Sequence, residues 1–319
     1  MKAVVGYGVA LCVALVGAYQ TWTHEGDPDL SGATVILDVD RDELASIEFD
    51  SPSSTLVLEA REDELGPYVW GVFTPKDGEA LEPSVFKVGA AGETLVGNLA
   101  PFVSKRVLEG VDESKLEELG FGEEESQLTI RREGREPQRY QVAAKVYGGR
   151  NRYVRDPQDG TVYVVAAGTI QQLETARTTL PDRSLVGYDP TDISSITVRG
   201  GEAEVTYAQQ NPDDRSARFW ALEGRTEPNP AAAGWIDKVL NLRISRYLEQ
   251  DPPGLEEAFS LVVASGRKAT EVVVLRALGE DGEMGWYARS PYDRAVVVLN
   301  ASAVEEVFAD LPAVLDAGA

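Results

Sequence analysis

The chain has 319 residues and a formal net charge of -23, with 30 basic side chains against 53 acidic ones. Clustered Lys and Arg bind nucleic-acid backbones and anionic lipid head groups, so this charge argues against both as partners of the body. Hydrophobic residues make up 43% of the chain, which suffices for globular cores, and the length predicts two domains. Cys12 is the only cysteine, which excludes an intramolecular disulfide and a cysteine-based metal site.

An uncharged and mostly apolar run occupies residues 3–19, between Lys2 and an acidic stretch at residues 25–29. As a helix, about 17 residues span roughly 25 Å, and with their flanks they reach the roughly 30 Å of a bilayer core. Trp22 lies where an interfacial aromatic belongs, and the positive charge before the run predicts a cytoplasmic N-terminus. We therefore expect a single-pass anchor in the inner (cytoplasmic) membrane, with the body on the periplasmic or extracytoplasmic side.

Two other interpretations of this segment stay open. Val16, Gly17 and Ala18 resemble the small-residue site of a cleaved signal peptide. Cys12 is a candidate for the lipid-carrying cysteine of a lipoprotein signal, although Leu11 stands where such signals have a small residue. The intact mass of the mature protein separates an anchor from a cleaved signal.

The remainder of the chain shows an internal duplication. Ile47 and Ile196 lie in similar alternating segments about 149 positions apart, and Trp70 and Trp220 lie in similar aromatic segments about 150 positions apart. Such matched spacing is hard to obtain by chance from independent strand signals. The expected strands are residues 45–49, 55–59 and 68–72 in the first half and residues 194–198, 203–207 and 218–222 in the second.

A helix, further strands and a closing helix complete each half of the expected pattern. In the second half, Trp235, Ile236 and Val239 have the amphipathic spacing of a helix. Residues 156–160 are expected to form a hairpin turn. The first helices are expected at residues 94–107 and 231–242, the later strands at 126–132, 139–145, 152–155, 161–165, 260–264, 271–275, 286–290 and 295–299, and the closing helices at 169–176 and 301–308.

Short alternating strands joined by tight turns predict antiparallel meanders that pack on helices with one face. The expected fold class is therefore α+β, with two tandem copies of an antiparallel-sheet-plus-helices module after one N-terminal transmembrane helix. Trp70 and Trp220 are interpreted as core anchors rather than ligand platforms, because a large ring in mid-strand buries much area. The expected segments are residues 1–22 for the anchor or signal, 23–33 for a linker, 34–185 for the first repeat and 186–319 for the second.

The residues also carry a resemblance to a known family. A repeated Ser-Ile start leads through an alternating strand and an acidic loop to a tryptophan strand and a helix. The motifs that follow are a Leu-Gly-Phe-Gly turn at residues 119–122, a Gly-rich stretch before Tyr153, the strand at 162–165 and the Leu-Pro-Asp-Arg run at 180–183. This pattern resembles the domain-of-unknown-function 4340 family over most of the chain after residue 34. The resemblance implies an exported, membrane-anchored protein that accompanies gliding-type ABC transport components, and it carries over no catalytic residue.

The sequence offers no recognisable catalytic set. His24 is the only histidine and follows the apolar run, so Ser-His and Cys-His chemistry and His-rich metal sites are nearly excluded. Residues 38–42 resemble the start of a calcium loop, but Glu43 and Phe49 stand where an EF-hand has Gly and Glu. The glycines of residues 147–153 precede an expected strand, whereas a phosphate-binding loop leads into a helix. We therefore expect no enzyme activity, catalytic residue, cofactor or metal site.

Three functional hypotheses remain. The first is a non-enzymatic accessory or scaffold protein of an envelope complex, whose partners are integral membrane or envelope proteins, with an ABC permease as one candidate. The second is a module that binds a carbohydrate, a peptide or a lipid in the cleft between the repeats. Trp286 and Tyr287 are candidate aromatic contacts there, although a place in the buried core is the favoured interpretation of both. The third is a carboxylate-only hydrolase of glycans, for which the sequence marks no particular pair of acids.

Overall fold

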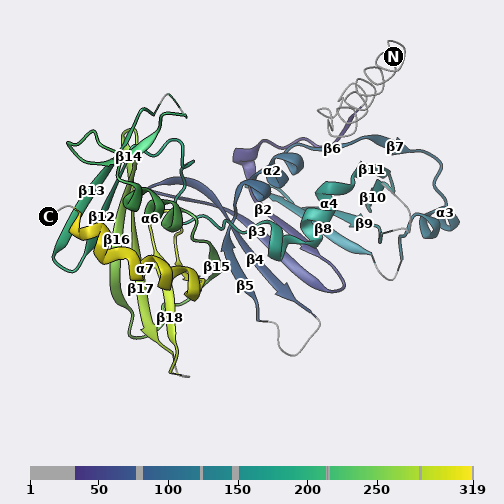
Figure 1. The fold of residues 1–319 in the computed structure, drawn as a ribbon. Coiled ribbons are helices and arrows are strands. Elements are labelled where there is room, and N and C mark those ends of the chain that lie inside the picture. Colours follow the sequence, from purple (N-terminus) through teal and green to yellow (C-terminus); the bar gives the residue numbers. More distant parts are fainter. Residues whose placement is uncertain are drawn as a thin grey trace, which may run out of the picture.

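The computed structural model describes residues 33–76, 82–122, 125–145, 151–212, 214, 216–279 and 282–317. These residues form mostly antiparallel sheets with a few helices, which is the α+β class that the sequence predicts. The two large sheets make two lobes of one elongated body (Figure 1). The predicted membrane helix at residues 3–19 lies outside the described residues, and no described helix is both long and apolar enough to cross a bilayer.

The first large sheet is antiparallel, and alternate residues of its strands are buried. In β3, for example, Leu56 and Leu58 are buried while their neighbours are partly exposed, as a strand with one covered face requires. Helices α2 (Ala90–Leu99), α4 (Ala167–Glu174) and α5 (Ala176–Thr179) lie on one side of the sheet (Figure 1). The strand order is β5 (Ser84–Lys87), β4 (Gly66–Pro75), β3 (Ser54–Asp63), β2 (Leu44–Asp50), β8 (Ser126–Arg132), β9 (Gln138–Val142), β10 (Asn151–Arg155), β11 (Val162–Ala166) and β7 (Arg106–Leu108).

Smaller elements flank the first sheet. β1 (Thr34–Leu37) pairs with β6 (Phe102–Ser104) in a separate two-stranded sheet. A short 3-10 helix, η1 (Arg41–Glu43), leads into β2. α3 (Glu113–Glu118) lies at the end of the first lobe that is remote from the second lobe (Figure 1). Leu116 of α3 and Leu119 after it pack there against a small second hydrophobic cluster.

The second large sheet is covered on one side by α6 (Pro230–Leu240) and α7 (Ala301–Asp316) (Figure 1). Pro230 opens α6 and Asn229 caps it, because the Asn229 side chain accepts a hydrogen bond from Ala232 N. Trp235 of α6 donates from Nε1 to the carbonyl of Val307 in α7 over 2.8 Å, which fixes the two helices together. The strand order is β14 (Phe219–Leu222), β13 (Ala203–Gln210), β12 (Ser195–Gly200), β16 (Glu256–Ser265), β17 (Lys268–Leu278), β18 (Met284–Arg289), β19 (Val296–Leu299) and β15 (Ile244–Tyr247).

The two sheets have the same strand order when they are read from β4 and from β14, and β5 is an additional strand at the edge of the first sheet. Their registers also agree. Ile47 lies opposite Leu58 in the first sheet, and Ile196 lies opposite Tyr207 in the second, so both members of the pair are shifted by the same number of positions. The pairs β10–β11 and β18–β19 correspond in the same way.

Two predicted helices have different ends in the structure. α2 ends at Leu99 rather than at residue 107, because Pro101 follows closely and has no N–H for a helical hydrogen bond. The residues after it form β6 and β7 instead. α7 continues beyond the predicted end at residue 308 to Asp316, because Leu311 and Val314 extend its buried stripe.

Trp70 and Trp220 are both buried in the core, as predicted, but they point to different sides of their sheets. Trp220 lies opposite Gln209, on the same helix-covered side as Tyr207. Trp70 lies opposite Glu59, on the side of the first sheet away from its helices. Successive strand residues point to opposite faces. The two tryptophans are one position further apart than the two isoleucines. This difference of one residue places Trp70 and Trp220 on opposite faces of their corresponding strands.

The segment 180–184 joins the lobes by pairing with an edge of each sheet. On the β5 side, Asp182 N donates to Lys87 O over 2.8 Å. On the β15 side, Ile244 N donates to Arg183 O over 3.1 Å. One continuous cluster of buried hydrophobic residues includes residues of both lobes.

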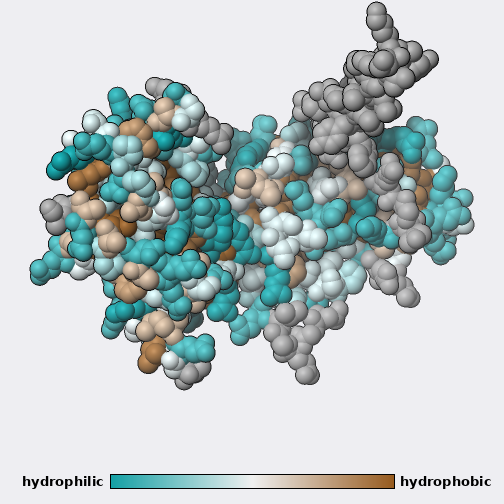
Figure 2. All heavy atoms as spheres, viewed as in Figure 1, coloured by the Kyte–Doolittle hydropathy of each residue, from teal (hydrophilic) through white to brown (hydrophobic). Residues whose placement is uncertain are grey.

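The surface around this core is mixed in character. On the face shown in Figure 2, hydrophobic residues appear as separate spots among hydrophilic ones. The large hydrophobic side chains exposed among the described residues are Val35, Leu65, Leu278 and Met284. Leu278 and Met284 face each other across the β17–β18 hairpin, and the other two lie on different elements.

Candidate functional site at the junction of the two sheets

The junction of the lobes contains a buried group of charged and phenolic side chains, which we call the junction cluster. Its members come from β5, the segment 180–184, β15 and the loop between β18 and β19. They are Lys87, Asp182, Tyr247, Tyr292 and Asp293. Buried charges are uncommon unless they are paired, so the cluster is the first place to look for a function beyond packing.

Lys87 is the cation of the junction cluster and is only 6% exposed. Its Nζ lies 2.9 Å from Asp182 Oδ2 and 3.2 Å from the centre of the Tyr292 ring. The Tyr292 hydroxyl donates to the same carboxylate oxygen over 2.5 Å. Burial lowers the pKa of Lys87, and the Asp182 carboxylate opposes this shift. Lys87, Asp182 and Tyr292 thus all contact one another, and they join β5, segment 180–184 and the loop after β18.

Asp293 is fully buried beside this pair. Its Oδ2 accepts a hydrogen bond from Ser290 Oγ over 2.7 Å, and its own N–H donates to that Oγ over 3.1 Å. The other oxygen, Oδ1, has no hydrogen-bond partner among the described residues. Burial raises the pKa of Asp293 to about 7, although the Ser290 hydroxyl and the Lys87 charge act in the opposite direction.

Tyr247 connects β15 to the cluster. Its hydroxyl donates to the carbonyl of Asp182 over 3.0 Å. Its ring packs edge-on against Trp70, with 6.0 Å between the ring centres. The outward side of Trp70 is therefore buried by the second lobe. Burial raises the pKa of the Tyr247 and Tyr292 phenols, so both stay protonated donors.

Arg294 ties the far end of β3 to the same loop. Its guanidinium meets Asp63 at 2.9 Å and 3.2 Å through two nitrogens, and its Nη1 donates to the carbonyl of Tyr292 over 2.7 Å. The guanidinium also lies 4.5 Å from the centre of the Tyr68 ring. Such a two-point contact fixes direction as well as distance. The β3–β4 hairpin of the first lobe is thereby fastened to the second.

Two glycines leave room for these contacts. A Cβ on Gly187 would lie 2.2 Å from the Tyr292 ring, and a Cβ on Gly89 would lie 2.9 Å from the Asp182 backbone. Real Cβ atoms do not approach other heavy atoms so closely. The close packing of residues around the junction cluster therefore depends on the absence of a side chain at both positions.

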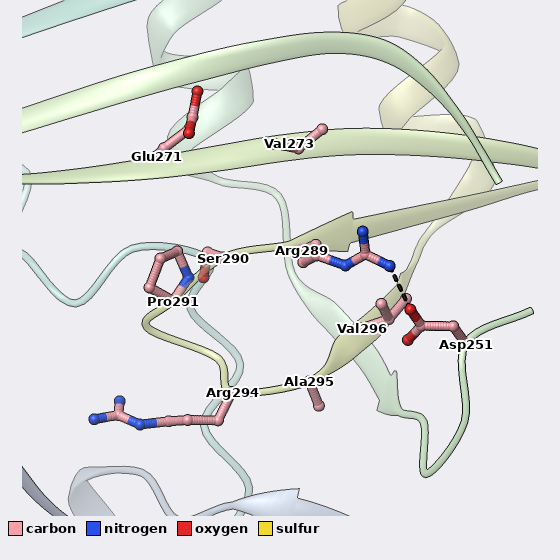
Figure 3. A pocket seen from close by; sticks show the side chains of 9 residues that line it. All are labelled: Asp251, Glu271, Val273, Arg289, Ser290, Pro291, Arg294, Ala295 and Val296. Atoms are coloured by element: carbon pink, nitrogen blue, oxygen red, sulfur yellow. Dashed lines mark hydrogen bonds and ion pairs between the residues drawn. The ribbon is translucent and has the colours of Figure 1, made fainter. Parts of the chain in front are cut away.

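An open groove of about 500 Å³ is lined by residues on both sides of Tyr292 and Asp293 in the chain, among them Ser290 and Arg294 (Figure 3). Val273 and Val296 line it, and Arg289 pairs with Asp251 at its rim. Strand pairing places Val273 opposite Arg289 and Ser260, on the side of the sheet away from α6 and α7. Ser290 and Arg294 belong to both the groove and the surroundings of the cluster. The residues that line the groove all come from the second lobe.

The aromatic residues proposed for a cleft are in other places. Trp286 is buried on the helix-covered side, where its ring centre lies 5.3 Å from that of Phe308 in α7. Tyr287, the next residue, points to the opposite side and is half-buried. Neither residue lines the groove. Trp286 is thus a core residue, as the favoured interpretation of the sequence has it, and it is not a cleft contact.

The other predicted motifs have ordinary local structures where the structure describes them. Residues 41–43 form η1, and no three His, Cys, Asp or Glu side chains of the described segments are placed to hold a metal ion. The hairpin turn at residues 156–160 is confirmed: Asp156 N donates to Thr161 O over 2.9 Å, and Gly160 has a φ of 77°. Residues 146–150, Cys12 and His24 lie outside the described residues.

Sequence reasoning missed the junction cluster because its charged members are far apart along the chain. Lys87 and Asp182 are 95 positions apart, and Asp182 and Tyr292 are 110 positions apart. The signal that pointed to this place was the Leu-Pro-Asp-Arg run at residues 180–183, which carries Asp182 and Arg183. The sequence pattern gives this run as a family motif and predicts no structural role for it.

The fold and the junction define an α+β protein whose two antiparallel sheets share one core. The chain belongs to the family described as Domain of unknown function (DUF4340), whose model matches residues 93–261, just over half of the chain. The match begins in α2 and ends in β16, so it includes the segment that joins the lobes. Neither curated proteins nor solved structures gave a match.

Proposed function

We propose that this protein is a non-enzymatic accessory or scaffold subunit of an envelope complex. In this proposal residues 3–19 anchor the chain in the inner membrane and the body lies on the extracytoplasmic side. Its partners are integral membrane or envelope proteins, and an ABC permease is one candidate. The apolar run after Lys2 and the membership of the family support this proposal.

We also infer that the body consists of two tandem copies of one module, residues 34–185 and 186–319. The common strand order and the matched registers of the two sheets support this inference. Repeated modules present similar surfaces at two places of one body, which suits a protein that holds other proteins in position. β5 and segment 180–184 would then be the parts added to join the copies.

The observation that carries the scaffold function is the way the lobes are fastened. Backbone pairing on both sides of segment 180–184, the buried Lys87–Asp182 pair and the clamp of Arg294 on Asp63 hold the sheets in one arrangement. A fixed arrangement of two lobes presents an extended surface, whereas the groove beside the junction is open and offers little enclosure to a substrate.

Site-specific photo-crosslinking of the full-length chain in its native membranes tests this function. A photoreactive residue replaces Arg131 or Glu204, which lie on the helix-free sides of the first and second sheets. Glu305, exposed on α7, is the matched control position. We expect the photoreactive residue at position 131 or 204 to form adducts with one and the same membrane protein in repeated experiments. Adducts that are absent at all positions, or equal in kind and amount at the control, contradict the scaffold function.

Membrane attachment is tested separately by extraction and mass. The full chain is expected to stay in the membrane pellet at alkaline pH and to retain the mass of residues 1–22. A variant without residues 1–22 is expected to be released. Release of the full chain, or a mature mass that lacks the segment, contradicts an anchor.

A second candidate function is binding of a carbohydrate, a peptide or a lipid. The groove beside the junction favours it, since apolar Val273 and Val296 lie there next to the charged Arg289. A thermal-shift screen of these three ligand classes against the full chain tests it, because a ligand that binds the folded state raises Tm. The shift should disappear in Arg289→Glu and persist in Arg246→Glu, which changes an exposed arginine outside the groove. Equal shifts in both variants exclude this groove as the binding site.

A further inference from the structure

The charges around the junction leave one carboxylate without a counter-ion. Lys87 pairs with Asp182, and Arg294 pairs with Asp63. No described cation lies within ion-pair distance of Asp293, although this residue is completely buried. As a carboxylate, Asp293 would therefore be a fully buried negative charge without an ion-pair partner among the described residues. A buried unpaired charge strongly destabilises its surroundings, whereas a neutral carboxylic acid does not.

Asp293 is surrounded by groups from each element at the junction. β5 contributes Lys87, and β15 contributes Tyr247. Segment 180–184 contributes Asp182 and Arg183, and the Arg183 guanidinium donates to the carbonyls of Ile244 and Ser245 in β15. Its own loop contributes Ser290, Tyr292 and Arg294. Arg294 in turn forms an ion pair with Asp63 of β3. Lys87 attracts the carboxylate while Asp182 repels it. One lysine thus has to serve two carboxylates when Asp293 is ionised.

We propose that Asp293 is a proton-controlled latch between the lobes: as an acid it lets the loop that follows β18 close on β5 and segment 180–184, and as a carboxylate it weakens this contact. This inference goes beyond the proposed function, since it concerns how the lobes are held together whatever partner binds them. A proton removes the charge from the carboxyl whose Oδ1 has no hydrogen-bond partner among the described residues, whereas the carboxylate form gains solvation when the junction opens.

The latch works in a physiological range because burial raises the pKa of Asp293 to about 7. The folded junction keeps the proton in acid, and the carboxylate form becomes the main one as the pH rises past this value. Lys87 stays the only described cation that contacts Asp182, so a second carboxylate competes with an existing pair rather than forming a new one. The lobes are therefore expected to hold together more tightly in mild acid.

Hydrogen exchange of the full chain, read by mass spectrometry, measures this opening. The reporter peptides contain Asp182 and Ile244, whose amides form the inter-lobe backbone bonds. Asp293→Asn keeps the shape of the side chain and removes its ionisation, and comparison at equal pH removes the effect of pH on exchange chemistry. Between about pH 5 and 7, opening in the wild type should rise by up to about tenfold per pH unit relative to Asp293→Asn.

Two further variants make the test specific. Asp251→Asn removes a carboxylate that lines the neighbouring groove, and the Asp251 side chain is 58% exposed. This variant should leave the pH dependence of the opening unchanged. Ser290→Ala removes the hydroxyl that lowers the pKa of Asp293, so it should move the transition to higher pH. If Asp293→Asn does not fold, the shift of the transition in Ser290→Ala still tests whether Asp293 controls the opening. The latch is refuted if Asp293→Asn opens with the same pH dependence as the wild type, or if Ser290→Ala leaves the transition in place or lowers it.

Discussion

At the scale of single residues, the junction depends on a lysine that has almost no access to water. Lys87 is tolerated because Asp182 supplies the opposite charge and Tyr292 supplies an aromatic face. A buried ion pair adds little net stability, but the loss of one partner leaves the other charge unpaired. The cluster is therefore sensitive to substitution even though it contributes little hydrophobic burial.

Lys87→Met is expected to lower the free energy of unfolding by about 3–5 kcal/mol near pH 8, because Asp182 loses its ion-pair partner and the nearby Asp293 carboxylate loses the attraction of the Lys87 charge. The loss should be smaller near pH 5, where Asp293 carries a proton. Urea unfolding at the two pH values measures both. Arg199→Met is the control: Arg199 pairs with Glu204 on the surface, and its loss should leave stability nearly unchanged. Equal effects of the two substitutions speak against a buried cluster.

The pH dependence of stability has a definite sign at Asp293. Its pKa in the folded protein is about 7, above the ordinary value of 3.8, so the folded state retains a proton that the unfolded state has released. The stabilisation that this proton contributes is fully present below the ordinary value of 3.8, and it is lost as the pH rises through about 7. The slope of the unfolding free energy should differ from that of Asp293→Asn by at most about 1.4 kcal/mol per pH unit. Parallel curves in urea would show that Asp293 does not titrate in this range.

At the scale of elements, α2 shows how packing overrides local preference. This short helix contains Gly92 and Gly97, and glycine weakens a helix interior. Gly92 is buried against Val88 and Leu180, next to the pairing of β5 with segment 180–184, so its lack of a side chain allows close contact. Gly97 is exposed and has no atom near the position of a Cβ.

These two glycines predict opposite effects of the same substitution. Gly92→Ala should destabilise the protein by about 1–3 kcal/mol, since the new Cβ would lie 2.2 Å from Val88 Cγ1. Gly97→Ala should stabilise it by about 0.4–1 kcal/mol through the lower entropy of the unfolded chain. Thermal unfolding of the pair measures the difference. Similar shifts of Tm in one direction would mean that α2 is not packed as described.

The strands that sequence analysis missed are the short ones. β5, β7 and β15 have four, three and four residues, which leaves little alternation to recognise, although β14 and β19 are also four residues long and were predicted. Longer strands were predicted to within a few residues, and β8 has the predicted bounds. β5 and β15 owe their place to segment 180–184, which pairs with both, so local sequence has little to say about them.

At the scale of the whole molecule, the two lobes share one core, which predicts that they unfold together. Leu58 is buried in β3 of the first sheet, and Leu58→Ala should cost about 2–5 kcal/mol. Under conditions where exchange requires global unfolding, hydrogen exchange should show the same loss of protection in β17 of the second sheet. Leu278→Ala, at an exposed position, is the control and should change neither sheet. Loss confined to the first sheet would show that the lobes unfold independently.

The candidate site was predictable only in part. The sequence marked residues 180–183 and placed the tryptophans in strands, but the partners of Asp182 come from β5 and from the loop after β18. Such contacts depend on the angle at which two sheets meet, and no periodicity within one segment encodes that angle. Trp70 was placed in its strand correctly, while its contact with Tyr247 required the position of the second lobe.

The sequence by itself determined the α+β class and most of the strands and helices, because alternation and helical spacing report which face of a local segment is buried. It also carried the family membership. The tertiary structure alone decided that Trp70 faces the second lobe, that one segment pairs with both sheet edges, and that Lys87, Asp182 and Asp293 meet in a buried cluster. The reason is physical: these contacts join residues about a hundred positions apart, and their energies exist only once the two sheets have packed.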